Sequence, residues 1–66
     1  MRGTIHTVML GRSFGYITAE NGKNYFFHSD DLEGLDFNEQ LRERRVEFVD
    51  TSELKGPRAK SVRGVD

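Results

Sequence analysis

The sequence predicts an all-β fold, a small antiparallel barrel of five short strands. Five runs rich in β-branched and aromatic residues are separated by turn-forming residues. The 66 residues contain no pattern for a long helix and no cysteine, so a compact apolar core must hold the fold without disulfides. Closing the sheet into a barrel would leave no exposed strand edges. We expect residues 1–66 to form one domain.

The central hairpin gives the clearest signal. Residues 14–19 and 24–28 flank Asn21 and Gly22, a strong indication of a tight turn between two strands. Successive side chains of a strand point to opposite faces, so one set enters the core and the other stays outside. The side chains predicted to share the outer face are Phe14, Tyr16, Phe26 and His28.

Three further strands complete the predicted barrel. Residues 2–10 are expected to form the first strand, residues 46–50 the fourth and residues 58–62 the fifth. Pro57 stands at a strand start, where the missing N–H is tolerated. The side chains predicted to point inward are Ile5, Ile17, Tyr25, Phe27, Leu32, Val46, Phe48, Ala59 and Val62.

The connections are expected to be short turns and loops. Ser29 or Asp30 is predicted to cap a helical turn over residues 29–32. Residues 38–45 have the propensity for a turn or two of helix, although so short a helix is marginal by itself. Residues 51–55 are expected to form a loop.

Composition and motifs exclude several classes of function. No apolar run approaches the roughly 18 residues of a membrane span, and no signal-peptide pattern is present, so a cytoplasmic protein is expected. Only His6 and His28 are soft metal ligands, so no metal site is predicted. No nucleophile–base pattern or phosphate-binding glycine loop occurs, so we expect no enzyme, cofactor or small-molecule substrate. The net charge of −1 argues against binding polyanions by charge alone.

The outer rings of the hairpin indicate a binding surface. Three aromatic rings and an imidazole on an exposed sheet face are costly to leave in water, and such patches usually mark binding sites. Flat rings beside the cations Arg12 and Lys23 suit stacking on unpaired bases. The predicted partner is therefore single-stranded RNA or DNA, bound by a monomer.

Four short motifs resemble those of the cold shock domain family, the smallest form of the five-stranded OB barrel. Residues 3–5, Gly-Thr-Ile, resemble the family's opening Gly-Thr-Val, and residues 12–17, Arg-Ser-Phe-Gly-Tyr-Ile, resemble its first RNA-binding motif. Residues 26–28, Phe-Phe-His, resemble the second motif, and residues 55–62 resemble the closing Gly-Pro-Gln-Ala…Val. The RRM, another fold with this motif pair, needs the reverse order and two helices, which this chain lacks room for.

The resemblance implies roles for individual residues. His6 and Arg12 stand where the family usually has lysine and would face phosphate, and Phe37 lies near the position of a further loop aromatic. Arg58 and Lys60 are additional candidates for phosphate contact. The implied activity is RNA chaperoning or regulation of gene expression, because coating an unpaired strand competes with hairpin formation. The stacking rings implied by the motifs are Phe14, Tyr16, Phe26 and His28.

Three aromatic residues of the family pattern are missing here. Thr7 and Val8 stand where the family usually has tryptophan and phenylalanine, and Ser29 replaces the aromatic that usually follows the histidine. Each lost base–aromatic stack costs about 1–3 kcal/mol of binding. An alternative function therefore stays open, an OB-barrel module that binds another protein. For Phe37 the alternative is a plug at the end of the barrel, and for the cations it is a solvated surface.

Overall fold

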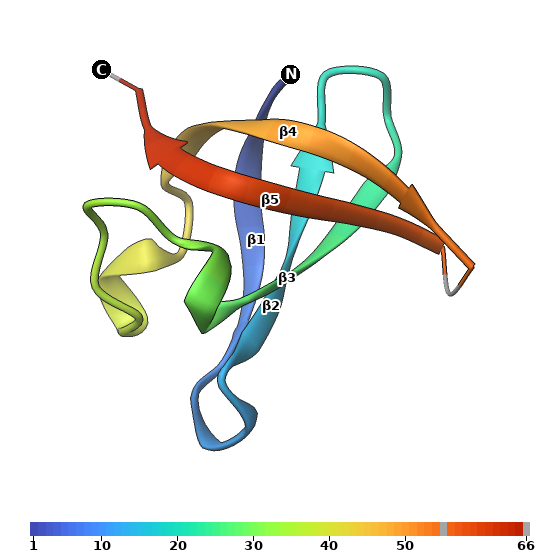
Figure 1. Cartoon of the computed structure of the whole chain (residues 1–66). Helices are drawn as coiled ribbons and strands as arrows, with labels where there is room; N and C mark the ends of the chain where they lie inside the picture. Colours follow the sequence, from blue (N-terminus) through green and yellow to red (C-terminus); the bar gives the residue numbers. More distant parts are fainter. Residues whose placement is uncertain (55, 66) are drawn as a thin grey trace.

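The computed structural model, which describes residues 1–54 and 56–65, is a closed barrel of five strands (Figure 1). The strands follow one another around the barrel in the order β1-β2-β3-β5-β4, and β4 pairs with β1 to close it. The predicted all-β barrel is therefore confirmed. The strands are β1 (Arg2–Met9), β2 (Phe14–Ala19), β3 (Asn24–His28), β4 (Arg45–Glu53) and β5 (Gly56–Gly64).

One of the strand pairings is parallel. β3 runs parallel to β5 through the pair Phe26 and Arg58, whereas the other neighbours around the barrel are antiparallel. A closed ring with an odd number of strands cannot alternate in direction throughout, so one parallel pairing is unavoidable. This pairing is short, and a parallel bridge between Leu32 and Val62 extends it. The closure is important for the site because it sets Arg58 beside Phe26.

β4 and β5 are longer than the sequence predicts. β4 continues through Thr51 to Glu53, so the loop predicted over residues 51–55 is wrong for its first three positions, and Lys55 lies outside the described residues. Pairing between the two strands explains the extension, because Thr51 lies opposite Arg58 and its hydroxyl donates to the Arg58 carbonyl oxygen at 3.1 Å. The two strands form the long orange and red ribbon of Figure 1.

Short 3-10 turns connect the strands. The helix considered for residues 38–45 is limited to the 3-10 turn Glu39–Leu41. It stops there because Glu43 adopts a left-handed φ of 68° and its N–H donates to the Ile5 carbonyl oxygen at 2.8 Å, which attaches the chain to β1. The other two turns are Leu10–Arg12 and Ser29–Asp31. Within the described ranges, no helix is long and apolar enough to cross a membrane.

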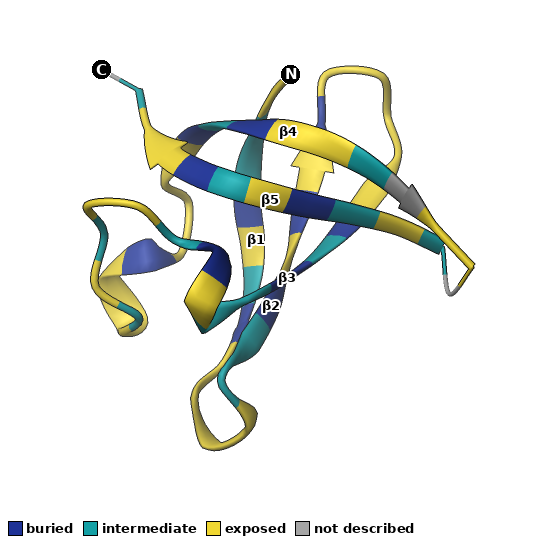
Figure 2. Cartoon of the chain, viewed as in Figure 1, coloured by how far each residue is buried: buried dark blue, intermediate teal, exposed yellow. Residues whose placement is uncertain are grey.

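Apolar side chains fill the barrel, and Figure 2 shows buried and exposed positions alternating along the strands. All predicted inward residues are buried except Leu32, which is half-buried and packs against the core. Val8, Ala19 and Leu41 also belong to the core although they were not in the predicted set. Val8 turns inward because a register shift between Ile5 and Thr7 reverses the parity of β1.

Candidate nucleic-acid interface

The outer rings of the central hairpin form one continuous patch, which we call the ring surface. The antiparallel register of β2 and β3 sets Phe14 opposite His28 and Tyr16 opposite Phe26. The ring centroids of Phe14 and Phe26 are 5.4 Å apart, and those of Tyr16 and Phe26 are 5.9 Å apart. These are contact distances for aromatic pairs. The ring surface consists of Phe14, Tyr16, Phe26 and His28, as the strand parity predicts.

Packing on the inner side of the hairpin holds the ring surface in place. Phe27 lies between Phe26 and His28 in sequence and is fully buried, so the strand cannot rotate without exposing it. Gly15 lies between Phe14 and Tyr16, and a Cβ there would overlap the Thr7 carbonyl oxygen and lie 2.9 Å from the Phe27 ring. The missing side chain thus lets β1 and β2 approach closely below the rings.

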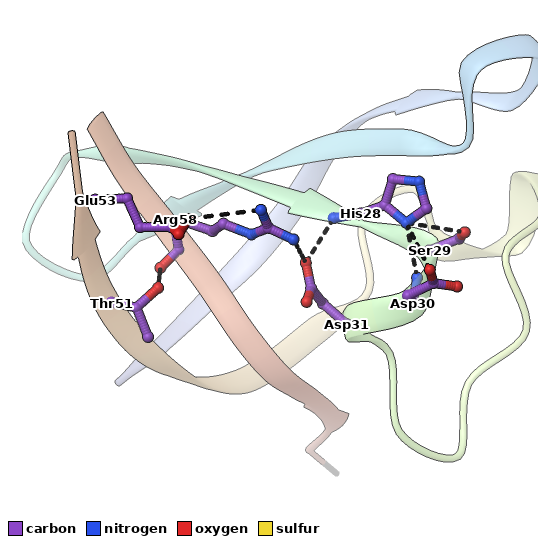
Figure 3. Close-up of polar contacts among 7 residues, drawn as sticks. All are labelled: His28, Ser29, Asp30, Asp31, Thr51, Glu53 and Arg58. Atoms are coloured by element: carbon purple, nitrogen blue, oxygen red, sulfur yellow. Dashed lines mark hydrogen bonds and ion pairs between the residues drawn. The ribbon is translucent and has the colours of Figure 1, made fainter. Parts of the chain in front are cut away.

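His28 both belongs to the ring surface and caps the turn that follows β3. Its Nδ1 accepts a hydrogen bond from the Asp30 N–H at 3.1 Å, and Asp31 Oδ2 accepts from the His28 N–H at 2.9 Å (Figure 3). The predicted caps, Ser29 and Asp30, are therefore wrong, since the capping side chain is one residue earlier. Because Nδ1 is an acceptor, the neutral ring carries its proton on Nε2 and can donate it to a ligand.

Arg58 lies beside Phe26 with its charge balanced by two carboxylates. Its guanidinium carbon is 5.6 Å from the centroid of the Phe26 ring. One terminal nitrogen lies 3.2 Å from Asp31 Oδ2 and the other lies 3.5 Å from Glu53 Oε1 (Figure 3). Asp31 is only 8% exposed, so this ion pair also links the turn after β3 to β5. Because two carboxylates already pair with the Arg58 guanidinium, we expect it to attract a phosphate less strongly than an unpaired arginine would.

A pocket of about 470 Å³ opens along one side of the ring surface. This volume lies in the range of about 300–1,000 Å³ that is typical of small-molecule sites. Sequence reasoning named His28 and Arg58 as site residues but missed Glu53, because it placed Glu53 in a loop and did not predict the β3–β5 contact. A second pocket of about 440 Å³, lined by Arg2, Glu20 and Arg45 among others, has no aromatic lining. The pocket beside the rings is lined by Tyr16, Asn24, Phe26, His28, Glu53, Pro57 and Arg58.

The first strand adds one more ring at the edge of this surface. The His6 and Tyr16 rings lie 6.4 Å apart with an interplanar angle of 24°, and His6 is exposed. His6 Nδ1 also lies 2.8 Å from the Thr7 hydroxyl. Thr7 is directly opposite Tyr16, so of the two positions where the family usually has aromatics only Thr7 stands beside the rings. Val8 is a core residue and is not part of the ring surface.

The remaining predicted residues lie in different surroundings. Arg12 is exposed at the end of the 3-10 turn that leads into β2, two positions before Phe14. Lys60 is exposed on β5 opposite Val49. Phe37 is half-buried, and its ring lies 6.3 Å from the buried Phe27 ring, so it packs against the core in the manner of a plug.

Comparisons with known proteins agree with this geometry. Residues 1–65 match the family described as the "cold-shock" DNA-binding domain. The chain is 35% identical over 63 residues to the cold shock-like protein of Aquifex aeolicus, a match that covers 94% of this chain and 90% of the relative. It is 32% identical over 63 residues to the major cold shock protein CspA of Pseudomonas aeruginosa, with 96% and 91% covered. The resemblance seen in the motifs is confirmed, and the chain belongs to the cold-shock DNA-binding domain family.

Proposed function

We propose that this protein binds single-stranded RNA or DNA by stacking unpaired bases on the ring surface. The observation that carries the proposal is the contact between accessible rings from two neighbouring strands. Tyr16 is 37% exposed, and the half-buried rings of Phe14 and Phe26 each pack edge to face against it. Every base has a flat π-face, so stacking of this kind tolerates different sequences and is worth about 1–3 kcal/mol per base.

Phosphate contacts have a minor part in this proposal. Arg12, His6 and Lys60 are exposed and are the proposed phosphate contacts, whereas Arg58 is already paired with carboxylates. With about three to five contacts on a single strand, the logarithm of affinity should fall with the logarithm of salt at about −0.7 per contact. A much steeper slope would mean that charge, rather than stacking, carries the binding.

The biological consequence we propose is RNA chaperoning. Bases stacked on the ring surface cannot pair with another strand, so the bound chain opposes hairpin formation without a catalytic step. We further propose that the protein acts as a monomer, since the ring surface is complete within one barrel. The cytoplasm is the proposed location.

Anisotropy titrations of labelled oligo-U and oligo-dT, single-stranded and as duplexes, test the proposal. We expect binding of single strands in the micromolar range or tighter, and weaker binding of duplexes. The double variant Phe14→Ala/Phe26→Ala should lose this binding while its circular dichroism stays unchanged. Val49→Ala is a matched control, because it truncates an exposed apolar side chain of β4 outside the pocket.

Two results would contradict the proposal. No single-strand binding at high micromolar protein and low salt would favour the alternative, a barrel that binds another protein. Equal binding by wild type and the double variant would place the nucleic-acid site away from the rings. The observation that favours this alternative is the threonine at position 7, where the family usually has an aromatic residue.

A further inference from the structure

The pocket beside Phe26 contains a carboxylate, which is unexpected for a surface that binds a polyanion. Glu53 lines the pocket together with Phe26 and Arg58. Its side chain is partly exposed, and only Oε1 approaches Arg58, at the long distance of 3.5 Å. A carboxylate has about four acceptor positions, so this contact leaves most of them free. Glu53 therefore offers strong acceptors at the edge of an aromatic platform.

A phosphate cannot face this carboxylate, because the two negative charges repel each other. The edge of a base can face it, since bases in single strands expose their Watson–Crick edges for hydrogen bonding. The group that meets Glu53 must then donate hydrogen bonds. This condition distinguishes the four bases, because they differ in the number and spacing of donors on that edge.

We propose that this pocket selects guanine, an inference that rests on the proposed function. Glu53 accepts hydrogen bonds from both the N1–H and the N2 amino group of the base. Guanine presents these two donors side by side, which matches the two oxygens of a carboxylate. Cytosine and adenine each present one amino donor next to an acceptor nitrogen, so they make a single hydrogen bond. Uracil presents one N–H between two carbonyl oxygens, and the carboxylate repels both of these oxygens.

Neighbouring groups suit this assignment. Arg58 approaches Glu53 from one side and is itself anchored by the buried Asp31, so the cation beside the carboxylate has a fixed position (Figure 3). Phe26 supplies the stacking face at the same pocket. His28 and Asn24 lie on its lining as well, and the Nε2–H of His28 is a donor suited to an acceptor atom of the guanine ring or sugar.

The test compares heptamers of uridine that carry one central guanine, inosine, cytosine or adenine, in the anisotropy assay. Wild type should bind the guanine heptamer about tenfold more tightly than the uridine parent, as expected for a bidentate contact. Inosine keeps N1–H but lacks the amino group, so its gain should be clearly smaller. Glu53→Gln should abolish the guanine preference while leaving affinity for the uridine parent equal or higher.

Glu33→Gln is the matched control, because it removes the same charge from an exposed residue outside the pocket and should keep the guanine preference. The inference is overturned if wild type binds all heptamers equally, or if Glu53→Gln retains the preference. In both cases, loss of binding in Phe14→Ala/Phe26→Ala would show that the proposed function still holds. If wild type binds no heptamer at all, the proposed function fails and the inference fails with it.

Discussion

The two faces of the β2–β3 hairpin carry similar side chains with opposite consequences. On the inner face, Tyr25 and Phe27 are at most 2% exposed and pack into the core. On the outer face, Phe14, Tyr16 and Phe26 contact one another and remain accessible. Residue type does not separate these sets, because both are aromatic. Parity along the strand does, because it places the inner rings in the core and leaves the outer rings accessible for the proposed stacking on bases.

The largest expected effect is on the inner face. Phe27→Ala should lower the free energy of unfolding by about 3–5 kcal/mol, since it removes a fully buried ring and leaves a cavity. A loss of this size is comparable to the whole stability of so small a domain. Urea denaturation followed by circular dichroism measures it. A Phe27→Ala protein as stable as wild type would contradict the assignment of this face to the core.

Asp31 lies in the turn that follows the hairpin and should give the next largest effect. Asp31→Ala removes a buried carboxylate that accepts from the His28 N–H at 2.9 Å and pairs with Arg58 at 3.2 Å. We expect the free energy of unfolding to fall by about 1–3 kcal/mol, because buried polar groups lose their partner. Asp30→Ala is the control, since the neighbouring carboxylate is 91% exposed. Equal losses from both variants would show that the contacts of Asp31 with His28 and Arg58 add nothing to stability.

The local part of this comparison could be predicted from the sequence. The Asn21-Gly22 turn fixes the register of the hairpin, and the period of two along each strand then separates Phe26 from Phe27. The same rule fails for Val8, because a bulge near Thr7 changes the parity and no residue type marks that bulge.

The non-local part of the site was not predictable in this way. The pocket requires the parallel contact of β3 with β5 and the extension of β4 to Glu53, both of which depend on barrel closure. Arg58 therefore appeared in the sequence as one cation among several, although it is held by Asp31 and Glu53. The cap by His28 was missed because histidine is not among the residues that usually cap turns.

Phe26→Ala tests the difference between the two faces directly, because Phe26 is adjacent to Phe27 in the sequence but lies on the outer face. The Phe26 ring is half-buried among its neighbours on the outer face, so the free energy of unfolding should fall by only about 1 kcal/mol or less. Affinity for oligo-U should fall by about 1–3 kcal/mol, the cost of one lost stack. Denaturation and anisotropy on the same protein measure both quantities. A large loss of stability with unchanged binding would reverse the roles of the two faces.

The smallest effect is expected at a contact that belongs to neither face. Glu39 Oε2 lies 2.6 Å from Arg42 Nε, and this hydrogen bond, assisted by the positive charge, lowers the pKa of Glu39 below its ordinary value of about 4.5. A carboxylate with a lower pKa in the folded state stabilises the fold above its unfolded pKa, and the contribution disappears as the pH falls through the folded pKa. Both side chains are exposed, so salt screens the pair.

Glu39→Gln should therefore be slightly less stable than wild type at pH 7, and the two proteins should become equal once the pH is below the lowered pKa of Glu39. Because other carboxylates titrate in the same range, the informative quantity is the difference in melting temperature between the two proteins at each pH. That difference should also shrink in 1 M salt. At any one salt concentration, Glu39→Gln should bind oligo-U as tightly as wild type does. A difference that persists at low pH would mean that packing of Glu39, rather than its charge, holds this turn.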